Sequence, residues 1–198
     1  MLRPKRPSVN MTSNDVLHPG HHSIRLKQRD YSAPDIYFVT ICTHEKRCTL
    51  GRVSEGAMIP SPLGEIVCQA WNEILAHYAH VKLPGFALMP NHVHGLVEIG
   101  RGPRVLAPPT DRPVGELKRL AVVPGSLGAI VRLFKAVVTQ RAHRDLRIVG
   151  EIWQRNYFER VVRERKEFSD TCRYISQNPL MWDGDQENPM SSARRDTQ

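Results

Sequence analysis

Hydrophobic residues recur along the chain with two periods, which predict strands and helices in a definite order. Residues 37–42 (YFVTIC) are rich in aromatic and β-branched side chains, which predicts a central strand. Residues 44–60 are polar and indicate a loop or short hairpin. The runs 86–89 and 92–99 are separated by a Pro-Asn turn, so they predict two strands of a hairpin. A further strand is predicted over 152–162.

Helical spacing appears in three places between and after these strands. Ser61 is predicted to cap the first helix with Pro62 at its first position, and Ser126 to cap the second. The first helix has one apolar face, formed by Leu63, Ile66, Val67, Ala70, Trp71, Ile74, Leu75 and Tyr78. The second has a stripe formed by Leu127, Ile130, Val131, Phe134, Val137 and Val138. A third helix is predicted over 164–177 and is stopped by the Asn-Pro pair that follows.

The resulting order is βαββαβ with one added helix at the C-terminal end. It predicts an α+β, ferredoxin-like (RRM-like) sandwich in which two helices cover one face of an antiparallel sheet. The other face should be free, and chemistry is expected there. We expect a flexible basic arm over 1–30, one domain over 31–182 with a Pro-rich insertion at 100–125, and a disordered tail over 183–198.

The composition favours an anionic partner. The formal net charge is +8 and the pI about 9.6, which suits binding to a polyanion through charge neutralisation. No apolar run approaches the roughly 20 residues of a membrane span, and no apolar stretch follows the basic start. The chain is therefore expected to be cytoplasmic, without membrane contact. Its cysteines form no CxxC pair and are expected to be reduced thiols: Cys42, Cys48, Cys68 and Cys172.

His92 and His94 are the first candidates for chemistry. Side chains alternate along a strand, so the two imidazoles share one face and can hold one metal ion, and Gly95 is expected to leave room beside them. The opposite, helix-covered face would carry Val93, Val97 and Ile99. Spacing alone also allows two histidines without a role. A histidine-triad hydrolase would need a third histidine where Leu96 stands, and a structural zinc site would need more ligands nearby.

Tyr174 is the second candidate, because it lies off the buried stripe of the third helix. Asn178, one turn on, offers an amide oxygen for a metal shell, and Gln177 is the competing donor. Taken alone, Tyr174 reads as a surface tyrosine. A phenol is a poor nucleophile at neutral pH, since its usual pKa is about 10. A divalent ion with open positions for phosphate oxygen would make transesterification through a phosphotyrosine feasible.

Basic residues suggest where nucleic acid is held. Arg132, Lys135 and Arg141 lie opposite the apolar stripe of the second helix, and some are expected to touch a DNA backbone. Arg155 is a further phosphate contact, with a solvated surface arginine as the alternative. The neighbouring Trp153 is expected in the core rather than as a base-stacking platform.

Five segments resemble the single-tyrosine HUH transposases of small insertion sequences, most closely the REP-associated tyrosine transposases. They are SIRLKQRDYSAPDIYFVTICT (23–43), FALMPNHVHGLVEI (86–99), SLGAIVRLFKAVVTQ (126–140), IWQRNYFERVVR (152–163) and RYISQNPLMW (173–182). The resemblance implies that His92 and His94 are metal ligands and that Tyr174 is the nucleophile. It further implies that Asn178, rather than Gln177, completes the metal site. Mg²⁺ or Mn²⁺ would be the cofactor. The substrate would be hairpin-bearing single-stranded DNA, cut to leave a 5′-phosphotyrosine and a 3′-hydroxyl.

The resemblance has two departures, and rival functions stay open. The 100–125 insertion is longer than in compact members, and Arg160 stands where relatives often have histidine. The chain could instead be an inactive relative that binds structured DNA without cleavage, or a replication-initiator or relaxase nuclease. Relatives often work as dimers with composite sites. The sequence therefore leaves open whether a homodimer forms and whether Tyr174 serves its own histidines or those of a second copy.

Overall fold

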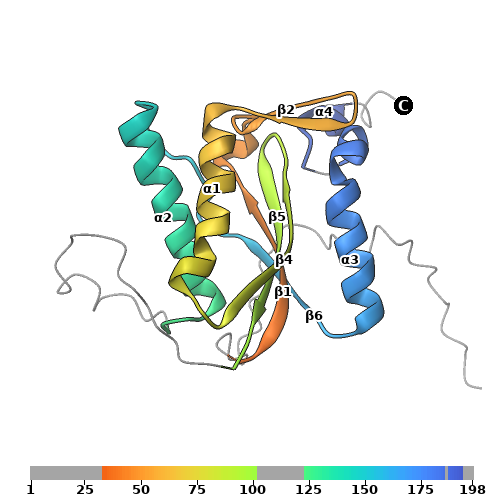
Figure 1. Cartoon of the computed structure of the whole chain (residues 1–198). Coiled ribbons are helices and arrows are strands. Elements are labelled where there is room, and N and C mark those ends of the chain that lie inside the picture. Colours follow the sequence, from red (N-terminus) through yellow and green to blue (C-terminus); the bar gives the residue numbers. More distant parts are fainter. Residues whose placement is uncertain (1–32, 102–122, 186, 194–198) are drawn as a thin grey trace, which may run out of the picture.

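The computed structural model describes residues 33–101, 123–185 and 187–193 (Figure 1). The predicted arm over 1–30 and most of the 100–125 insertion lie outside the described residues. The elements, in chain order, are β1 (Asp35–Cys42), η1 (His44–Lys46), β2 (Gly51–Ser54), β3 (Ala57–Pro60), α1 (Pro62–His77), β4 (Val81–Leu88), β5 (His92–Ile99), α2 (Leu127–Asp145), β6 (Phe158–Val162), α3 (Arg165–Gln177), η3 (Asn178–Gly184) and α4 (Pro189–Ala193).

A four-stranded antiparallel sheet organises the described residues. Its strand order is β4-β5-β1-β6, so β1 pairs with β5 on one side and with β6 on the other. The sheet strands and the helices between and after them follow the order βαββαβα, which confirms the predicted α+β, ferredoxin-like sandwich. A separate hairpin of β2 and β3 precedes α1, within the segment predicted as a loop or short hairpin. None of the described helices has the length and apolar character that crossing a membrane requires.

The larger core lies between the sheet and the helices α1 and α2 (Figure 1). Trp71 of α1 meets Phe134 of α2 edge to face, with 5.4 Å between the ring centroids. Both helices begin where the sequence predicts. The Ser61 hydroxyl accepts a hydrogen bond from the amide of Gly64 at 3.1 Å, and the Ser126 hydroxyl accepts one from Ala129 at 3.4 Å.

The second face of the sheet is covered by α3, so the expectation that this face is free is wrong (Figure 1). Phe38 of β1 and Leu96 of β5 form a smaller core there with Ile175 of α3. The physical reason is that the apolar stripe of α3 has to leave water, and the sheet offers the matching surface. A site on this face would therefore lie in the layer between sheet and helix.

Two strands differ in length from their prediction. β4 begins at Val81, five residues earlier than predicted, because a register shift between Lys82 and Gly85 accommodates a proline on this edge strand. β6 is shorter than predicted and begins at Phe158. Trp153 forms only an isolated bridge to Thr43, so the sheet ladder is interrupted between the bridge and β6.

The C-terminal segment corrects another expectation. The tail over 183–198 is predicted to be disordered, but its described part is folded: η3 extends to Gly184 and α4 covers Pro189–Ala193. Asp185, Glu187 and Asn188 are buried there. Polar residues at a chain end suggest disorder, yet these side chains find partners in the body of the protein, as described below.

The sequence predicts that Gly95 leaves room beside the histidines, but in the structure it packs against the larger core instead. Side chains alternate along β5, so Gly95 faces away from the side of the sheet that carries His92 and His94. A Cβ atom at this position would lie 2.2 Å from Cη2 of Trp71. The missing side chain therefore makes room for the indole ring of α1 and not for a ligand beside the imidazoles.

The Gly95→Ala variant should lower the free energy of unfolding by about 1–3 kcal/mol, because the added methyl group forces the Trp71 ring or the strand to move. Urea titration followed by tryptophan fluorescence measures the loss. Gly184→Ala is the matched control, since nothing lies within 4 Å of an added Cβ there. Equal stability of the two variants would contradict the assigned packing.

Candidate active site

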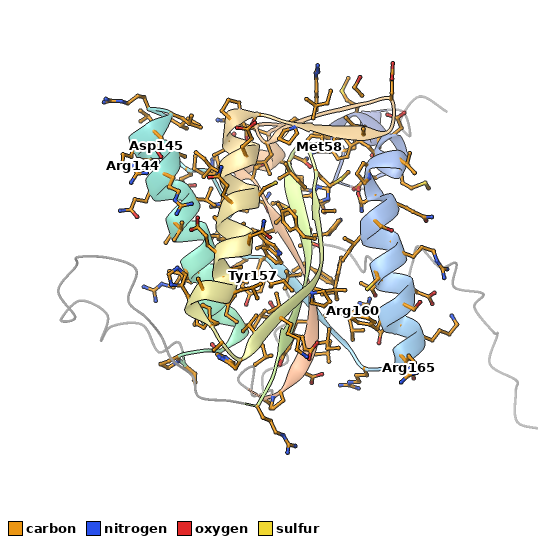
Figure 2. All side chains as sticks on the ribbon, viewed as in Figure 1. Met58, Arg144, Asp145, Tyr157, Arg160 and Arg165 are labelled. Atoms are coloured by element: carbon orange, nitrogen blue, oxygen red, sulfur yellow. The ribbon has the colours of Figure 1, made fainter. Side chains whose placement is uncertain are left out.

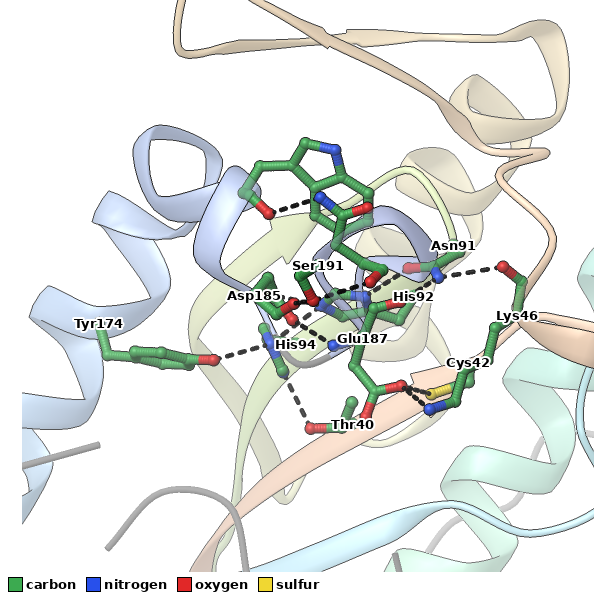
Figure 3. A network of polar contacts seen from close by, with 12 residues as sticks. Thr40, Cys42, Lys46, Asn91, His92, His94, Tyr174, Asp185, Glu187 and Ser191 are labelled. Carbon is green, nitrogen blue, oxygen red and sulfur yellow. Dashed lines mark hydrogen bonds and ion pairs between the residues drawn. The ribbon is translucent and has the colours of Figure 1, made fainter. Parts of the chain in front are cut away.

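The two histidines of β5 face each other inside the protein. Their Nε2 atoms lie 3.0 Å apart, and both side chains are 0% exposed within the described chain (Figure 3). Strand pairing holds this geometry from both sides, because β5 lies between β4 and β1. Phe38, on the same face of β1, stacks on the His94 ring with 5.2 Å between the centroids. The predicted sharing of one face by His92 and His94 is confirmed.

Tyr174 of α3 reaches this pair within the same chain. Its hydroxyl lies 3.3 Å from Nε2 of His94, and the two ring centroids are 5.3 Å apart (Figure 3). Phe38 contacts the Tyr174 ring edge to face at 6.1 Å. The phenol therefore does not project into solvent as a surface tyrosine would, but points at the imidazoles across the layer between α3 and the sheet.

Each imidazole has a second partner at its Nδ1 atom. Nδ1 of His94 lies 2.9 Å from the hydroxyl of Thr40, its register partner on β1. Nδ1 of His92 lies 2.8 Å from Oδ1 of Asn91. Polar partners on the far side of a ring fix its orientation, and metal-binding histidines commonly have them.

The C-terminal segment brings acidic groups to the histidines. Oδ2 of Asp185 lies 3.9 Å from Nε2 of His92, and the ring of Trp182 lies 6.2 Å from the His92 ring. The Glu187 carboxylate forms an ion pair with Nζ of Lys46 at 3.0 Å. It also accepts a hydrogen bond from the Cys42 thiol at 3.6 Å. These contacts hold the segment against η1 and the end of β1 (Figure 3).

Burial changes the acidity of two groups in the site. It raises the pKa of the Tyr174 phenol, and the Asp185 carboxylate adds to the rise. Asn178 opposes this rise, although no hydrogen bond of ordinary geometry joins it to the phenol. Burial likewise raises the pKa of Asp185 to about 6, against the stabilising amide of Glu187. At neutral pH the phenol is thus protonated, while Asp185 is mainly a carboxylate.

The donor set suits a divalent cation. His92, His94 and Asp185 each offer one ligand atom, and these atoms lie within 4.8 Å of one another. Two nitrogen ligands at a right angle, with bonds of about 2.1 Å, lie about 3.0 Å apart, against about 3.4 Å at a tetrahedral angle. At 3.0 Å, the two Nε2 atoms are close enough to bind one ion together.

Asn178 is buried and interacts with Tyr174, whereas Gln177 lies on the surface. The Asn178 side chain is 1% exposed, and its amide atoms have no hydrogen-bond partner among the described residues. A buried amide without partners is unusual and fits a donor waiting for a ligand. Gln177 is exposed. Ligation by Asn178 stays a prediction.

The predicted DNA contacts lie mostly away from the phenol. α2 packs on the opposite face of the sheet from Tyr174 (Figure 1). Arg141 of α2 makes two hydrogen bonds to Glu73 at 2.9 and 2.7 Å, and Lys135 donates to the carbonyl oxygens of Gln154 and Asn156. Burial lowers the pKa of Lys135 to about 8. Arg132 and Arg155 are exposed. DNA contact by these four residues stays a prediction.

The remaining expectations concern single residues. Trp153 is buried in the larger core, as predicted. The four cysteines are free thiols. Arg160 of β6 forms an ion pair with Glu167 of α3 and lies 3.4 Å from the Thr171 hydroxyl (Figure 2). It thereby fastens α3 to the sheet.

Three site residues are missing from the sequence prediction. Thr40 is part of an apolar strand run, Asn91 reads as a turn residue, and Asp185 lies in the segment predicted to be disordered. Strand alternation relative to His94 could identify Thr40 only together with the pairing of β1 with β5. No local signal marks Asp185, because its proximity to His92 depends on the path of the chain after α3.

Replacing Lys46 by methionine should loosen the C-terminal segment. The Glu187 carboxylate is 6% exposed and would lose its ion-pair partner. Amide hydrogen exchange at 187–191 should become about tenfold faster, because the free energy of local opening falls by on the order of 1–2 kcal/mol. The control is Lys82→Met, which breaks an exposed pair with Glu98 and should have little effect. Unchanged exchange in the Lys46 variant would show that other contacts hold the segment.

Comparison with known proteins identifies one relative by sequence and one neighbour by fold. No protein-family model matches the chain. It is 37% identical over 171 residues to an uncharacterized protein of Haemophilus influenzae, which covers 84% of this chain and 93% of that protein. A structure of a REP-associated tyrosine transposase bound to a REP hairpin superposes with a TM-score of 0.53 at 15% identity, covering 78% of this chain and 72% of that one. A Deinococcus radiodurans protein assigned as a transposase gives a TM-score of 0.35 at 17% identity over 76% of this chain and 96% of its own, too low to add to the fold assignment. The chain therefore belongs to one family with the Haemophilus protein and has the fold of the REP-associated tyrosine transposases, the family that its sequence motifs resemble.

Proposed function

We propose that the chain is a metal-dependent DNA transposase that cuts and rejoins single strands through a 5′-phosphotyrosine. The observation that carries this proposal is the contact of 3.3 Å between the Tyr174 hydroxyl and Nε2 of His94, which itself lies 3.0 Å from Nε2 of His92. A tyrosine directed at two paired imidazoles is the arrangement that tyrosine-based phosphoryl transfer beside a metal ion requires.

The proposed substrate is single-stranded DNA with hairpin ends. Two observations support this class. The chain has a formal net charge of +8, which favours a polyanion. The REP-associated transposase that shares its fold was solved with a REP hairpin.

The proposed cofactor is Mg²⁺ or Mn²⁺, held by His92 and His94 with oxygen donors from Asp185 and Asn178. Hard divalent ions prefer octahedral sites with oxygen donors, and imidazole ligands are compatible with Mn²⁺. When bound, the ion would polarise a phosphate oxygen and neutralise charge that builds up on it.

The covalent step uses Tyr174 and an acid–base partner. The phenolic oxygen forms a bond to phosphorus, while the bond from phosphorus to the 3′ oxygen breaks and that oxygen gains a proton. The phenolic proton passes to a base. Nε2 of His94, 3.3 Å from the phenol, and the Asp185 carboxylate would both hold the cation, so we propose that a water molecule takes this proton. In the reverse step, the 3′-hydroxyl of another strand attacks phosphorus and releases the phenol, so no ATP is consumed.

The contact within one chain bears on subunit composition. Since Tyr174 reaches His94 of its own chain, we propose that one copy can assemble the whole site. A homodimer stays a prediction from the resemblance. It would then bring two complete sites together and would not be needed to complete either.

One observation favours a second candidate, an inactive relative that binds structured DNA. Both imidazoles are 0% exposed in the described chain, so a phosphate reaches them only after the residues around them move. Hairpin binding that needs no metal, without cleavage of any strand, would support this candidate.

The decisive test is a covalent adduct on denaturing gels. With Mn²⁺ and a hairpin-bearing single strand, the wild-type chain should form a protein–DNA adduct that EDTA prevents. Tyr174→Phe should form none, because the attacking oxygen is missing. Tyr157→Phe is the matched control: this tyrosine packs against the core on the other face of the sheet and should leave the adduct unchanged (Figure 2). An adduct formed by the Tyr174 variant would remove the proposed nucleophile.

The oxygen donors can be tested separately by Mn²⁺ titration. Asp185→Asn and Asn178→Ala should each weaken Mn²⁺ binding by at least about 10-fold, since each removes a donor beside the imidazoles. Gln177→Ala is the control, because this neighbouring amide is exposed. If one of the first two variants binds Mn²⁺ like wild type, that residue is not a ligand.

A further inference from the structure

Asn91 directly precedes β5, and both its side chain and its main chain make polar contacts with other segments. It is 0% exposed, and its Nδ2 atom lies 3.0 Å from the carbonyl oxygen of Lys46 and 2.6 Å from that of Glu187. Its own carbonyl accepts hydrogen bonds from the amide and the hydroxyl of Thr43, at 2.9 and 3.0 Å. Hydrogen bonds thus fix both the side chain and the main-chain carbonyl of Asn91, and Figure 3 shows the contact of the side chain with Lys46.

These contacts decide which way the Asn91 amide points. Backbone carbonyls only accept hydrogen bonds, so the group facing those of Lys46 and Glu187 has to be the NH₂ group. The oxygen Oδ1 then faces Nδ1 of His92 at 2.8 Å. An amide oxygen cannot donate, so Nδ1 of His92 has to carry the proton.

The consequence appears on the other side of the ring. A neutral imidazole has one N–H, so with the proton on Nδ1 the lone pair is on Nε2. That lone pair is directed at Nε2 of His94, 3.0 Å away. We infer that Asn91 is a positioning residue that sets the His92 tautomer and so presents the Nε2 lone pair to a divalent cation.

Thr40 contrasts with Asn91 at the neighbouring imidazole. Its hydroxyl lies 2.9 Å from Nδ1 of His94, but a hydroxyl can donate or accept. Thr40 therefore orients the His94 ring without dictating its tautomer. Among the contacts of the described residues, the partner of His92 at Nδ1 permits a single tautomer.

The test compares two variants whose effects differ if Asn91 acts through the tautomer. Asn91→Ala removes the acceptor and both donor contacts. Asn91→Asp keeps an acceptor for Nδ1–H of His92 but loses the donation to the two carbonyl groups. A purely structural role, fastening Lys46 and Glu187, would make the aspartate variant as defective as the alanine variant. A positioning role predicts that aspartate rescues.

Two measurements at pH 8 read the outcome. Long-range ¹H–¹⁵N correlation spectra of the metal-free full chain, with His92 assigned through a His92→Gln variant, report the tautomer. Wild type and Asn91→Asp should show the Nδ1–H form, and Asn91→Ala should show a mixture. Mn²⁺ affinity should fall about 10- to 100-fold in Asn91→Ala and stay within a few-fold of wild type in Asn91→Asp. Thr40→Val should leave the His92 tautomer unchanged.

The inference is overturned by an Nε2–H form of His92 in wild type, or by an aspartate variant as weak as the alanine variant. It is also overturned if Asn91→Ala keeps both the Nδ1–H form and the wild-type affinity. It rests on the proposed function only for the identity of the cation. An Nδ1–H signal in wild type without any DNA adduct would count against the proposed function and leave the tautomer assignment standing.

Discussion

The alternation of side chains along β5 is the constraint on which the site depends. Because successive residues face opposite sides, His92 and His94 must both point into the layer under α3, while Val93 and Gly95 face α1 and α2. Two imidazole nitrogens 3.0 Å apart would set lone pair against lone pair unless a proton or a cation lies between them. A pair of this kind can therefore hold either a shared N–H···N hydrogen bond or a cation.

The site also depends on elements far apart in the chain. β1 supplies Thr40 and Phe38, α3 supplies Tyr174, and the segment after α3 supplies Asp185. Burial makes the Tyr174 phenol a weaker acid, and the negative charge of Asp185 adds to this effect. Burial also disfavours the charged Glu187 carboxylate, and the ion pair with Lys46 compensates for this cost.

The basic residues of α2 that are predicted to contact DNA lie on the other side of the sheet from Tyr174, whereas α3 carries Arg165, Lys166 and Arg173 on the same helix as the phenol. The cations of α2 lie opposite its apolar stripe, as helical periodicity requires, but α2 covers the face away from Tyr174. Arg141 is engaged by Glu73 and Lys135 by backbone carbonyl groups. A strand held by α2 would therefore have to pass around the sheet to reach the phenol, whereas exposed Arg155 lies outside this helix.

Local pattern is enough to determine much of this protein. Periods of two and of 3.6 residues identify most of the strands, the helices and their caps, and strand alternation alone places His92 and His94 on one face. Helical spacing places Tyr174 off the apolar stripe of α3, where taken alone it reads as a surface tyrosine, and its proposed role comes from the resemblance to a known family. What only the tertiary structure decided is how distant segments meet: that α3 covers the second face, that Gly95 makes room for Trp71, and that Asp185 returns to His92. The reason is physical. Periodicity records which side of an element leaves water, but not which other element covers it, and a buried polar residue such as Asn91 shows its role only through partners from elsewhere in the chain.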